Sequence, residues 1–298
     1  MNQKFDINEF DSYIKNLKLS NGETYAYIDF NQDKTETIIL IHGNLVSSYW
    51  FYPLFQFLIN SDFRIIALDL RGFGRSSYNN KCEKIKDWAD DVADFSKQLN
   101  LSQSIFVGYS FGGGVVQELA INYPELVKKI VLLASVHIGG YPILNDGKRA
   151  TTYEEVLQNS VIQMTNDIIQ KKDFDAMYKV ALGALCNGKY KFNLNKQEDK
   201  RAVEEMLLQK CYYDVIYSLT CYDISSQGTG QYQQINQQIL IIHGDKDIIV
   251  VPNLAQNNFE SFGDKQAKLQ ILQGVSHLIT FDEPQQVSQT LLDFAKQN

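Results

Sequence analysis

The hydrophobic pattern near the N-terminus changes from alternation to short continuous apolar runs. Apolar and polar residues alternate through 17–19 and 24–28, on either side of an Asn21-Gly22 turn. This predicts a β-hairpin. Four continuous apolar runs follow at 37–41, 63–68, 104–107 and 129–134. Runs that are apolar on both faces are typical of buried parallel strands, and the helical segments between them indicate βαβ units.

The alternation of strands and helices stops after residue 135. The pattern from about 136 to 236 is mostly helical, with helices expected over 154–170, 174–185 and 200–217. Strand-like runs return at 238–242 and 268–272, and a closing helix is expected over about 284–295. We therefore predict an α/β fold with a mostly parallel central sheet flanked by helices. Its core domain would comprise residues 1–135 and 237–298, and residues 136–236 would form a helical cap insertion.

Composition excludes several classes of protein. The 298 residues are 44% hydrophobic, which is ample for a buried core, and the formal net charge is -7. Acidic and basic residues are interspersed, which argues against nucleic acid or an anionic membrane surface as the main partner. The polar N-terminus lacks the pattern of a signal peptide, and no apolar run reaches the roughly 18 residues of a membrane span. We expect a cytoplasmic protein.

The cysteines and histidines do not indicate a metal site. The four cysteines lie far apart without a C-x-x-C pair, and the four histidines are not clustered. His42 and His243 each end a strand and precede a glycine at a tight turn, so we interpret both as structural. His137 receives no role.

The most informative motif is Gly108-Tyr109-Ser110-Phe111-Gly112, which lies between a strand-like run and a helical run. A serine flanked by glycines at a strand-to-helix turn is typical of a nucleophile held clear of the sheet edge. Ser110 could instead be an ordinary serine at a helix start, but the three glycines at 112–114 would then weaken the helix without a reason. The segment lacks the Lys-Ser/Thr that completes a phosphate-binding loop.

A serine nucleophile requires a base and an acid, because its hydroxyl is unreactive at neutral pH. In a sheet of this kind such groups follow the carboxyl ends of strands. His277 follows the run at 268–272, and both Asp245 and Asp247 follow the run at 238–242. Spacing alone leaves the choice between the two carboxylates open. A satisfied surface imidazole is the alternative for His277, but its place at a strand end favours the base.

Backbone amides are also required, because the tetrahedral intermediate carries a negative charge. Asn44 follows the first strand of the parallel sheet, and Phe111 is the residue after the nucleophile. We predict that the N–H groups of Asn44 and Phe111 form the oxyanion hole.

At these residues the chain resembles the α/β-hydrolase family over nearly its whole length. The motifs that carry the resemblance are His42-Gly43-Asn44, Asp69 to Ser76, the turn at Ser110, Gly244 with Asp247, and Gly274 with His277. The family pattern places the acid three residues after Gly244, which is Asp247. Segments 42–48 and 71–79, and Gly140-Tyr141-Pro142 at the start of the insertion, are similar to bacterial carboxylesterases.

The resemblance implies a serine hydrolase that cleaves carboxylic esters of small to medium size through an acyl-enzyme, without cofactor or metal. Trp50 and Tyr141 are candidate substrate contacts, although packing within the protein would explain them equally well. Epoxide and haloalkane hydrolysis by this fold use a carboxylate nucleophile, and Ser110 excludes them. Hydrolysis of thioesters or carbon–carbon bonds stays open, as does a non-catalytic subunit or scaffold of a larger assembly.

Overall fold

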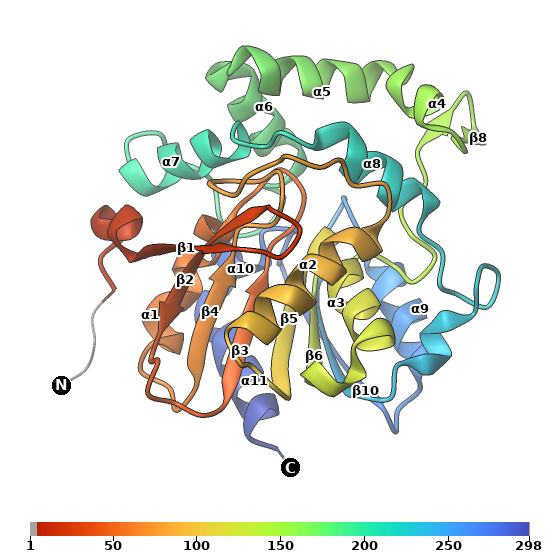
Figure 1. Cartoon of the computed structure of the whole chain (residues 1–298). Helices are drawn as coiled ribbons and strands as arrows, with labels where there is room; N and C mark the ends of the chain where they lie inside the picture. The colour runs from red at the N-terminus through yellow and green to blue at the C-terminus, as the bar shows by residue number, and fades with distance from the viewer. Residues whose placement is uncertain (1–4, 298) are drawn as a thin grey trace.

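The computed structural model describes residues 5–297, and an eight-stranded sheet forms their centre (Figure 1). The strand order is β1-β2-β4-β3-β5-β6-β9-β10. The strands are β1 Ile14–Lys18, β2 Thr24–Phe30, β3 Thr37–Ile41, β4 Arg64–Leu68, β5 Ser104–Tyr109, β6 Val127–Leu133, β9 Gln238–Gly244 and β10 Ala267–Leu272. Strand β2 runs antiparallel to β1 and β4, and the remaining pairs are parallel. The predicted hairpin and the predicted fold class are both confirmed.

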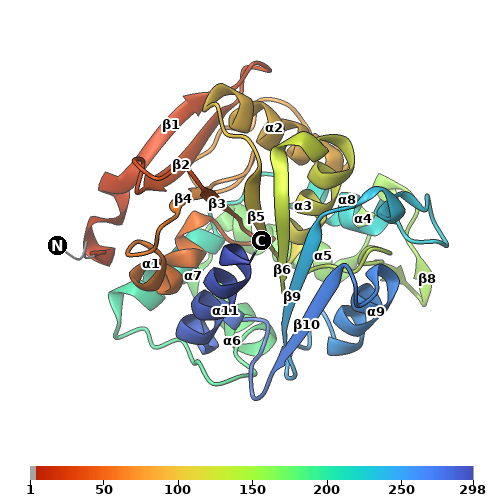
Figure 2. The ribbon, with the colours of Figure 1, turned by 90° about the horizontal axis from the view of Figure 1, so that it is seen from below.

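Helices cover both faces of the sheet, as the view along it shows (Figure 2). They are α1 Tyr52–Leu58, α2 Ile85–Gln98, α3 Phe111–Asn122, α9 Pro252–Phe262, α10 Ile279–Asp282 and α11 Pro284–Lys296, with 3-10 turns η1 Ile7–Tyr13, η2 Ser48–Phe51, η3 Pro124–Leu126 and η4 Gln231–Gln234. Ile38 and Leu40 of β3 pack in one core with α1 and α11, while Ile39 and Ile41 pack in a second core with α2 and α3. This two-sided burial explains why the strand is continuously apolar.

The segment between β6 and β9 is mostly helical and lies beyond one end of the sheet, at the top of Figure 1. It contains β7 Leu144–Asn145, β8 Lys148–Arg149, α4 Tyr153–Leu157, α5 Ser160–Lys171, α6 Phe174–Ala184, α7 Gln197–Met206 and α8 Tyr212–Cys221. Two of the expected helices are each divided in two. In the first, α4 ends at Leu157 and Asn159 starts α5 as its N-cap, because its side chain accepts from the amides of Val161 and Ile162. A link at 207–211 separates α7 from α8.

Helix α3 approaches the ends of β3 and β5 very closely. A Cβ atom on Gly112 would lie 2.4 Å from the carbonyl oxygen of Ile41. A Cβ atom on Gly108 would lie 2.4 Å from the carbonyl oxygen of Gly112. Real side chains do not make such contacts, so the glycines permit a helix position that alanine would not.

We predict that Gly112→Ala lowers the free energy of unfolding by about 1–3 kcal/mol, because the added methyl must displace the end of β3. Gly183 in α6 provides the matched control, since an added Cβ there meets nothing within 4 Å. Gly183→Ala should raise the free energy of unfolding by up to about 1 kcal/mol through helix propensity. Urea denaturation of the two variants checks this, and equal effects would contradict it.

Candidate active site

Ser110 occupies the turn between β5 and α3 in a strained backbone conformation, with φ 53° and ψ -117°. Such a conformation costs about 1–3 kcal/mol for a residue with a side chain. Hydrogen bonds from the amide of Ser110 and to its carbonyl hold this conformation. The Ser110 amide donates to the carbonyl of Leu133 (2.9 Å), and the Ser110 carbonyl accepts from the amides of Gly113 (2.9 Å) and Val136 (3.1 Å). The turn is therefore fixed by the neighbouring strand, and the hydroxyl remains partly exposed.

His277 lies between Ser110 and Asp247. Its Nε2 atom is 3.0 Å from Ser110 Oγ, and its Nδ1 atom is 2.7 Å from Asp247 Oδ2. The Tyr109 hydroxyl donates to the carbonyl of His277 (3.0 Å), which holds the backbone of the loop after β10. A carboxylate can only accept, so Nδ1 carries the proton and Nε2 is free to accept from the serine hydroxyl; this tautomer is assigned from the hydrogen-bond network.

The Asp247 carboxylate is buried but well satisfied. Its Oδ1 atom accepts from the amides of Ile249 and Val250, both at 2.9 Å, and His243 Nε2 lies 3.2 Å from its Oδ2 atom. Burial by itself would raise the pKa of Asp247, but the imidazole of His277 and the hydrogen bonds from His243 and His277 outweigh it. The pKa of Asp247 is therefore held well below its usual value, and the group is ionised at neutral pH.

Asp245 has a different position on the same loop. Its Oδ1 atom accepts from the amides of Gly274 (2.6 Å) and Val275 (3.3 Å). It therefore braces the loop that leads to His277, while Asp247 contacts the imidazole. Three-dimensional packing thus separates two carboxylates that sequence spacing could not distinguish.

The two amides expected to bind an oxyanion lie beside the serine. A Cβ atom on Gly43 would lie 2.9 Å from Ser110 Cβ, so the backbone before Asn44 passes close to Ser110. Phe111 is the first residue of α3, where backbone N–H groups have no partner within the helix. Across residues 5–297 the structure shows no hydrogen-bond acceptor for the amides of Asn44 and Phe111. Both amides are thus available, and the helix N-terminus favours negative charge.

The histidines at the other strand ends tie loops together. His42 Nδ1 lies 2.8 Å from the Gly43 carbonyl, and His42 Nε2 accepts from the Leu70 amide (3.0 Å). Burial lowers the pKa of His42, which favours the neutral ring that this pattern requires. His243 Nε2 lies 2.7 Å from the Val250 carbonyl. These contacts agree with the structural interpretation of both residues.

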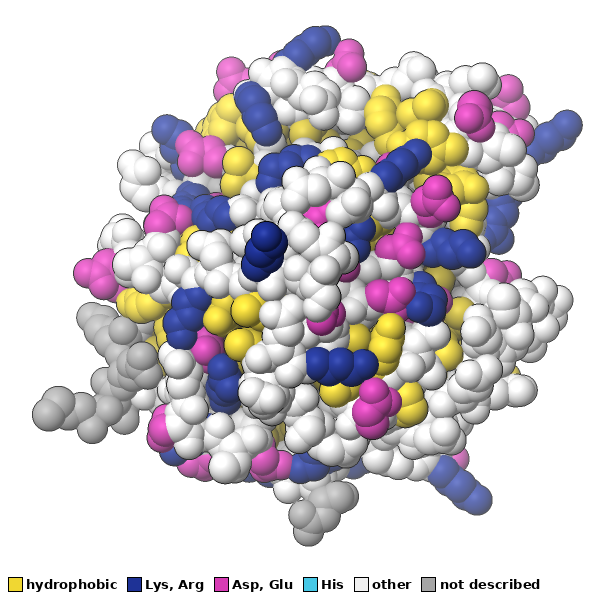
Figure 3. Space-filling view, in the orientation of Figure 1, with side chains coloured by type: hydrophobic (Ala, Val, Ile, Leu, Met, Phe, Trp, Pro, Cys, Tyr) yellow, Lys and Arg dark blue, Asp and Glu magenta, His cyan; other side chains and the backbone are white. Residues whose placement is uncertain are grey.

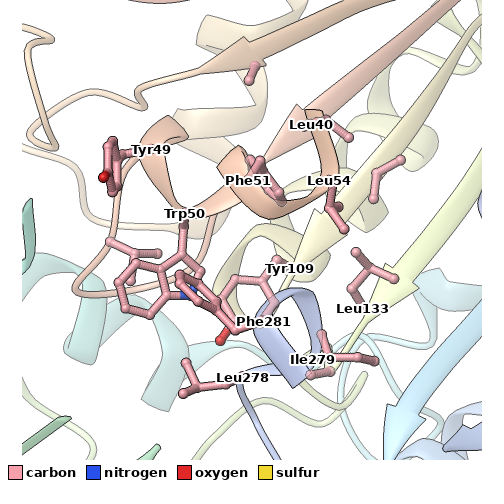
Figure 4. Close-up of a cluster of buried hydrophobic side chains, with 14 of the residues drawn as sticks. Leu40, Tyr49, Trp50, Phe51, Leu54, Tyr109, Leu133, Leu278, Ile279 and Phe281 are labelled. Atoms are coloured by element: carbon pink, nitrogen blue, oxygen red, sulfur yellow. The ribbon is translucent and has the colours of Figure 1, made fainter. Parts of the chain in front are cut away.

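Trp50 and Tyr141, the candidate substrate contacts, differ in exposure. Trp50 is 0% exposed, and its ring packs against Phe281 and Phe192 in an aromatic cluster beside Tyr109 (Figure 4). It therefore has no surface for a substrate to touch. Tyr141 is half-buried, and burial together with the charge of Asp247 raises its pKa.

Gln209 is a residue at the site that sequence reasoning missed. It lies in the link between α7 and α8, and its side chain contacts Asn44 and Leu45. The contact spans 165 positions of sequence, and no motif surrounds the glutamine. Only the position of the insertion over the core reveals it.

Three further features bear on possible partners: surface charge, metal-ligating side chains and long apolar helices. Acidic and basic side chains intermingle on the face shown in Figure 3. Within residues 5–297, no group of three or more His, Cys, Asp or Glu side chains is arranged to hold a metal ion. None of the helices in that range combines the length and apolar character needed to cross a membrane.

Comparison with known proteins identifies related chains. The model of the alpha/beta hydrolase fold family matches residues 36–284. A bifunctional esterase/perhydrolase from Acinetobacter calcoaceticus is 26% identical over 292 residues, covering 92% of this chain and 97% of that protein. Epoxide hydrolase 3 of Xenopus tropicalis is 22% identical over 288 residues, covering 93% of this chain and 76% of that protein.

A solved structure has the same fold. The esterase EaEST from Exiguobacterium antarcticum superposes with a TM-score of 0.76 at 20% sequence identity, covering 95% of this chain and 99% of that one. At this identity the likeness concerns the fold alone.

The depressed pKa of Asp247 predicts a pH-dependent contribution to stability. The ionised carboxylate stabilises the fold above the ordinary aspartate pKa of about 3.9, and this contribution is lost as the pH falls towards the lower pKa of the folded state. The difference in unfolding free energy between wild type and Asp247→Asn should therefore shrink by about 1 kcal/mol between pH 5 and pH 3. Urea denaturation at both pH values measures it, and a constant difference would contradict the depressed pKa.

Proposed function

Because the chain belongs to the alpha/beta hydrolase fold family, we propose that it is a serine hydrolase that cleaves carboxylic esters of small to medium size. The observation that carries this proposal is the continuous chain of contacts from Ser110 Oγ to His277 Nε2 (3.0 Å) and from His277 Nδ1 to Asp247 Oδ2 (2.7 Å). A hydroxyl, an imidazole and an ionised carboxylate in this order are the parts that nucleophilic acyl transfer requires.

The proposed reaction has two halves. Ser110 Oγ attacks the ester carbonyl carbon while His277 Nε2 takes its proton, and Asp247 stabilises the imidazolium that forms. The carbonyl oxygen becomes an oxyanion that accepts hydrogen bonds from the Asn44 and Phe111 amides. The imidazolium then protonates the leaving alcohol, which leaves an acyl-enzyme. Water attacks the acyl-enzyme by the same route, releasing the acid and restoring the serine hydroxyl.

The identity of the nucleophile separates this proposal from the reactions of some relatives. An epoxide hydrolase is among the relatives, but in this fold epoxide opening uses a carboxylate nucleophile, and position 110 is serine. The esterase names among the relatives are consistent with Ser110. Thioesters and carbon–carbon bonds could be cleaved by the same groups, so the acyl and leaving groups must be measured. A scaffold without turnover would not require the three side chains to be in contact.

The helical insertion contributes to the proposed active site. Residues 136–236 form a cap over a core domain of residues 1–135 and 237–298, and the five helices between β6 and β9 support this division. Tyr141, at the start of the cap and only half-buried, is the proposed substrate contact. The buried Trp50 is not part of it. The proposed chemistry uses no cofactor and no metal.

Ser110→Ala should abolish both labelling by a fluorophosphonate probe and hydrolysis of p-nitrophenyl esters, because it removes the attacking oxygen. Losses of about 10⁶ in turnover are typical for such variants. The melting temperature should stay near that of the wild type, since alanine keeps the Cβ atom and the backbone. Wild-type rates across p-nitrophenyl acetate to palmitate would define the acyl pocket, and a labelled Ser110→Ala variant would contradict the assignment.

Replacement of the two loop carboxylates should have unequal effects. Asp247→Asn should lower turnover by about 10⁴, because the amide favours the wrong tautomer of His277 and cannot stabilise the imidazolium. Asp245→Asn is the matched control, two residues away on the same loop, and its effect should be much milder. Turnover of one short-chain ester by both variants is the measurement, and the reverse ranking would place the acid at Asp245.

A further inference from the structure

The turn that carries the Asn44 amide has an unusual backbone. Leu45 has a φ of +62°, a left-handed conformation that residues with branched side chains rarely adopt. A single side chain from the insertion holds this turn from both sides. Gln209 Nε2 donates to Asn44 Oδ1 (2.9 Å), and Gln209 Oε1 accepts from the Leu45 amide (2.9 Å). The glutamine therefore bridges the side chain of one residue and the backbone of the next.

Gln209 is itself held rigidly. It is only 2% exposed. The next residue, Lys210, donates its backbone amide to the Gly72 carbonyl (2.7 Å) and its Nζ to the carbonyls of Ser76 (2.7 Å) and Gly74 (3.2 Å). The backbone bond from Lys210 to Gly72 thus fastens the link at 207–211 to the core. A side chain fastened in this way can impose a position on the turn that it contacts.

We propose that Gln209 is a positioning residue for ester hydrolysis, which orients the Asn44 amide toward the developing oxyanion. The inference rests on the proposed function, because it assigns the Asn44 amide to the oxyanion hole. An amide stabilises the transition state only if it is aimed in advance at the place where the charge develops. Displacement of a reacting group by about 1 Å can cost about 100-fold in rate. Gln209 does not touch the reacting atoms, so its effect passes through the 44–45 turn.

The consequence is that docking of the insertion completes the oxyanion hole. The glutamine belongs to the link between α7 and α8, whereas the amide that it orients belongs to the loop after β3. If Gln209 only filled space, its removal would lower stability and leave the preference for the transition state unchanged. The two roles therefore differ in a measurable quantity.

The test compares Gln209→Met with Lys210→Met. Gln209→Met keeps the length of the side chain and removes both hydrogen bonds to the turn. Lys210→Met removes the Nζ bonds to Gly74 and Ser76 but keeps the backbone bond to Gly72 that fastens the link, and the Lys210 side chain contacts neither Asn44 nor Leu45. The measurements are kcat and KM on p-nitrophenyl acetate, the affinity for an alkyl trifluoromethyl ketone, and the melting temperature. The ketone forms a tetrahedral adduct with the serine, so it reports on the oxyanion hole directly.

For Gln209→Met we expect kcat to fall about 10- to 100-fold, with KM within about twofold of wild type. The affinity for the ketone should fall by about the same factor as kcat/KM. Lys210→Met should keep kcat and ketone affinity within about twofold, even where its melting temperature falls. In an Asn44→Ala background, which keeps the backbone amide, Gln209→Met should cause a smaller loss than in wild type, because one of the two contacts of Gln209 with the turn is already absent.

Different results would overturn the positioning role of Gln209 and the proposed function. Equal effects of Gln209→Met and Lys210→Met on ketone affinity would overturn the positioning role. If Gln209→Met does not fold, Gln209→Ala replaces it, because it also removes both hydrogen bonds to the turn; wild-type ketone affinity in Gln209→Ala would equally overturn the role. A wild-type protein that neither reacts with fluorophosphonate nor hydrolyses esters would instead refute the proposed function, and the positioning role with it.

Discussion

The close approach of α3 to the carboxyl ends of β3 and β5 is the constraint on which the rest of the structure depends. Gly108 and Gly112 leave room for backbone atoms where a Cβ would lie 2.4 Å from a carbonyl oxygen. The chain therefore turns sharply at Ser110. The strained backbone of that residue costs about 1–3 kcal/mol, and hydrogen bonds to Leu133 and Val136 hold it in place. The same approach brings the first amide of α3 beside the loop that contains Gly43. The proposed nucleophile and the amides proposed to bind the oxyanion thus owe their positions to the same close approach.

Asp247 and His277, the proposed acid and base, are brought together by the pairing of β9 and β10. Parallel pairing of β9 and β10 places Leu272 opposite Gly244, so the loops that follow them start side by side. The Asp245 amide donates to Leu272 (3.0 Å), and the Lys246 amide donates to Val275 (2.8 Å), which joins the loops. A buried carboxylate is costly unless its oxygens are satisfied. The amides of Ile249 and Val250, in the same loop, donate to Asp247 Oδ1. His277, in the loop after β10, contacts Asp247 Oδ2.

The insertion is tied to the core by buried polar contacts next to the site. Glu205 of α7 is 3% exposed, accepts two hydrogen bonds from the Arg75 guanidinium (2.6 and 2.8 Å) and accepts a third from Ser47 Oγ (2.6 Å). The Glu205 carboxylate also lies 3.4 Å from Arg201 Nε, so several charged groups share this contact between the insertion and the core. The Gln209 bridge lies a few residues further along the same segment. The contact of the insertion with the core and the contact of Gln209 with the Asn44 turn are therefore made by neighbouring residues of one segment.

The sequence by itself determined the fold class and the places where chemistry belongs. Continuous apolar runs identify parallel strands buried on both faces, and side chains after such strands meet at one sheet edge, so Ser110 and His277 could be singled out from local pattern. Tertiary structure decided the rest. Asp245 and Asp247 are equivalent in spacing, and only the direction of each side chain puts Asp247 against His277 and Asp245 against Gly274. The burial of Trp50 and the contact of Gln209 with Asn44 arise between segments far apart in the chain, and local periodicity carries no information on such long-range packing.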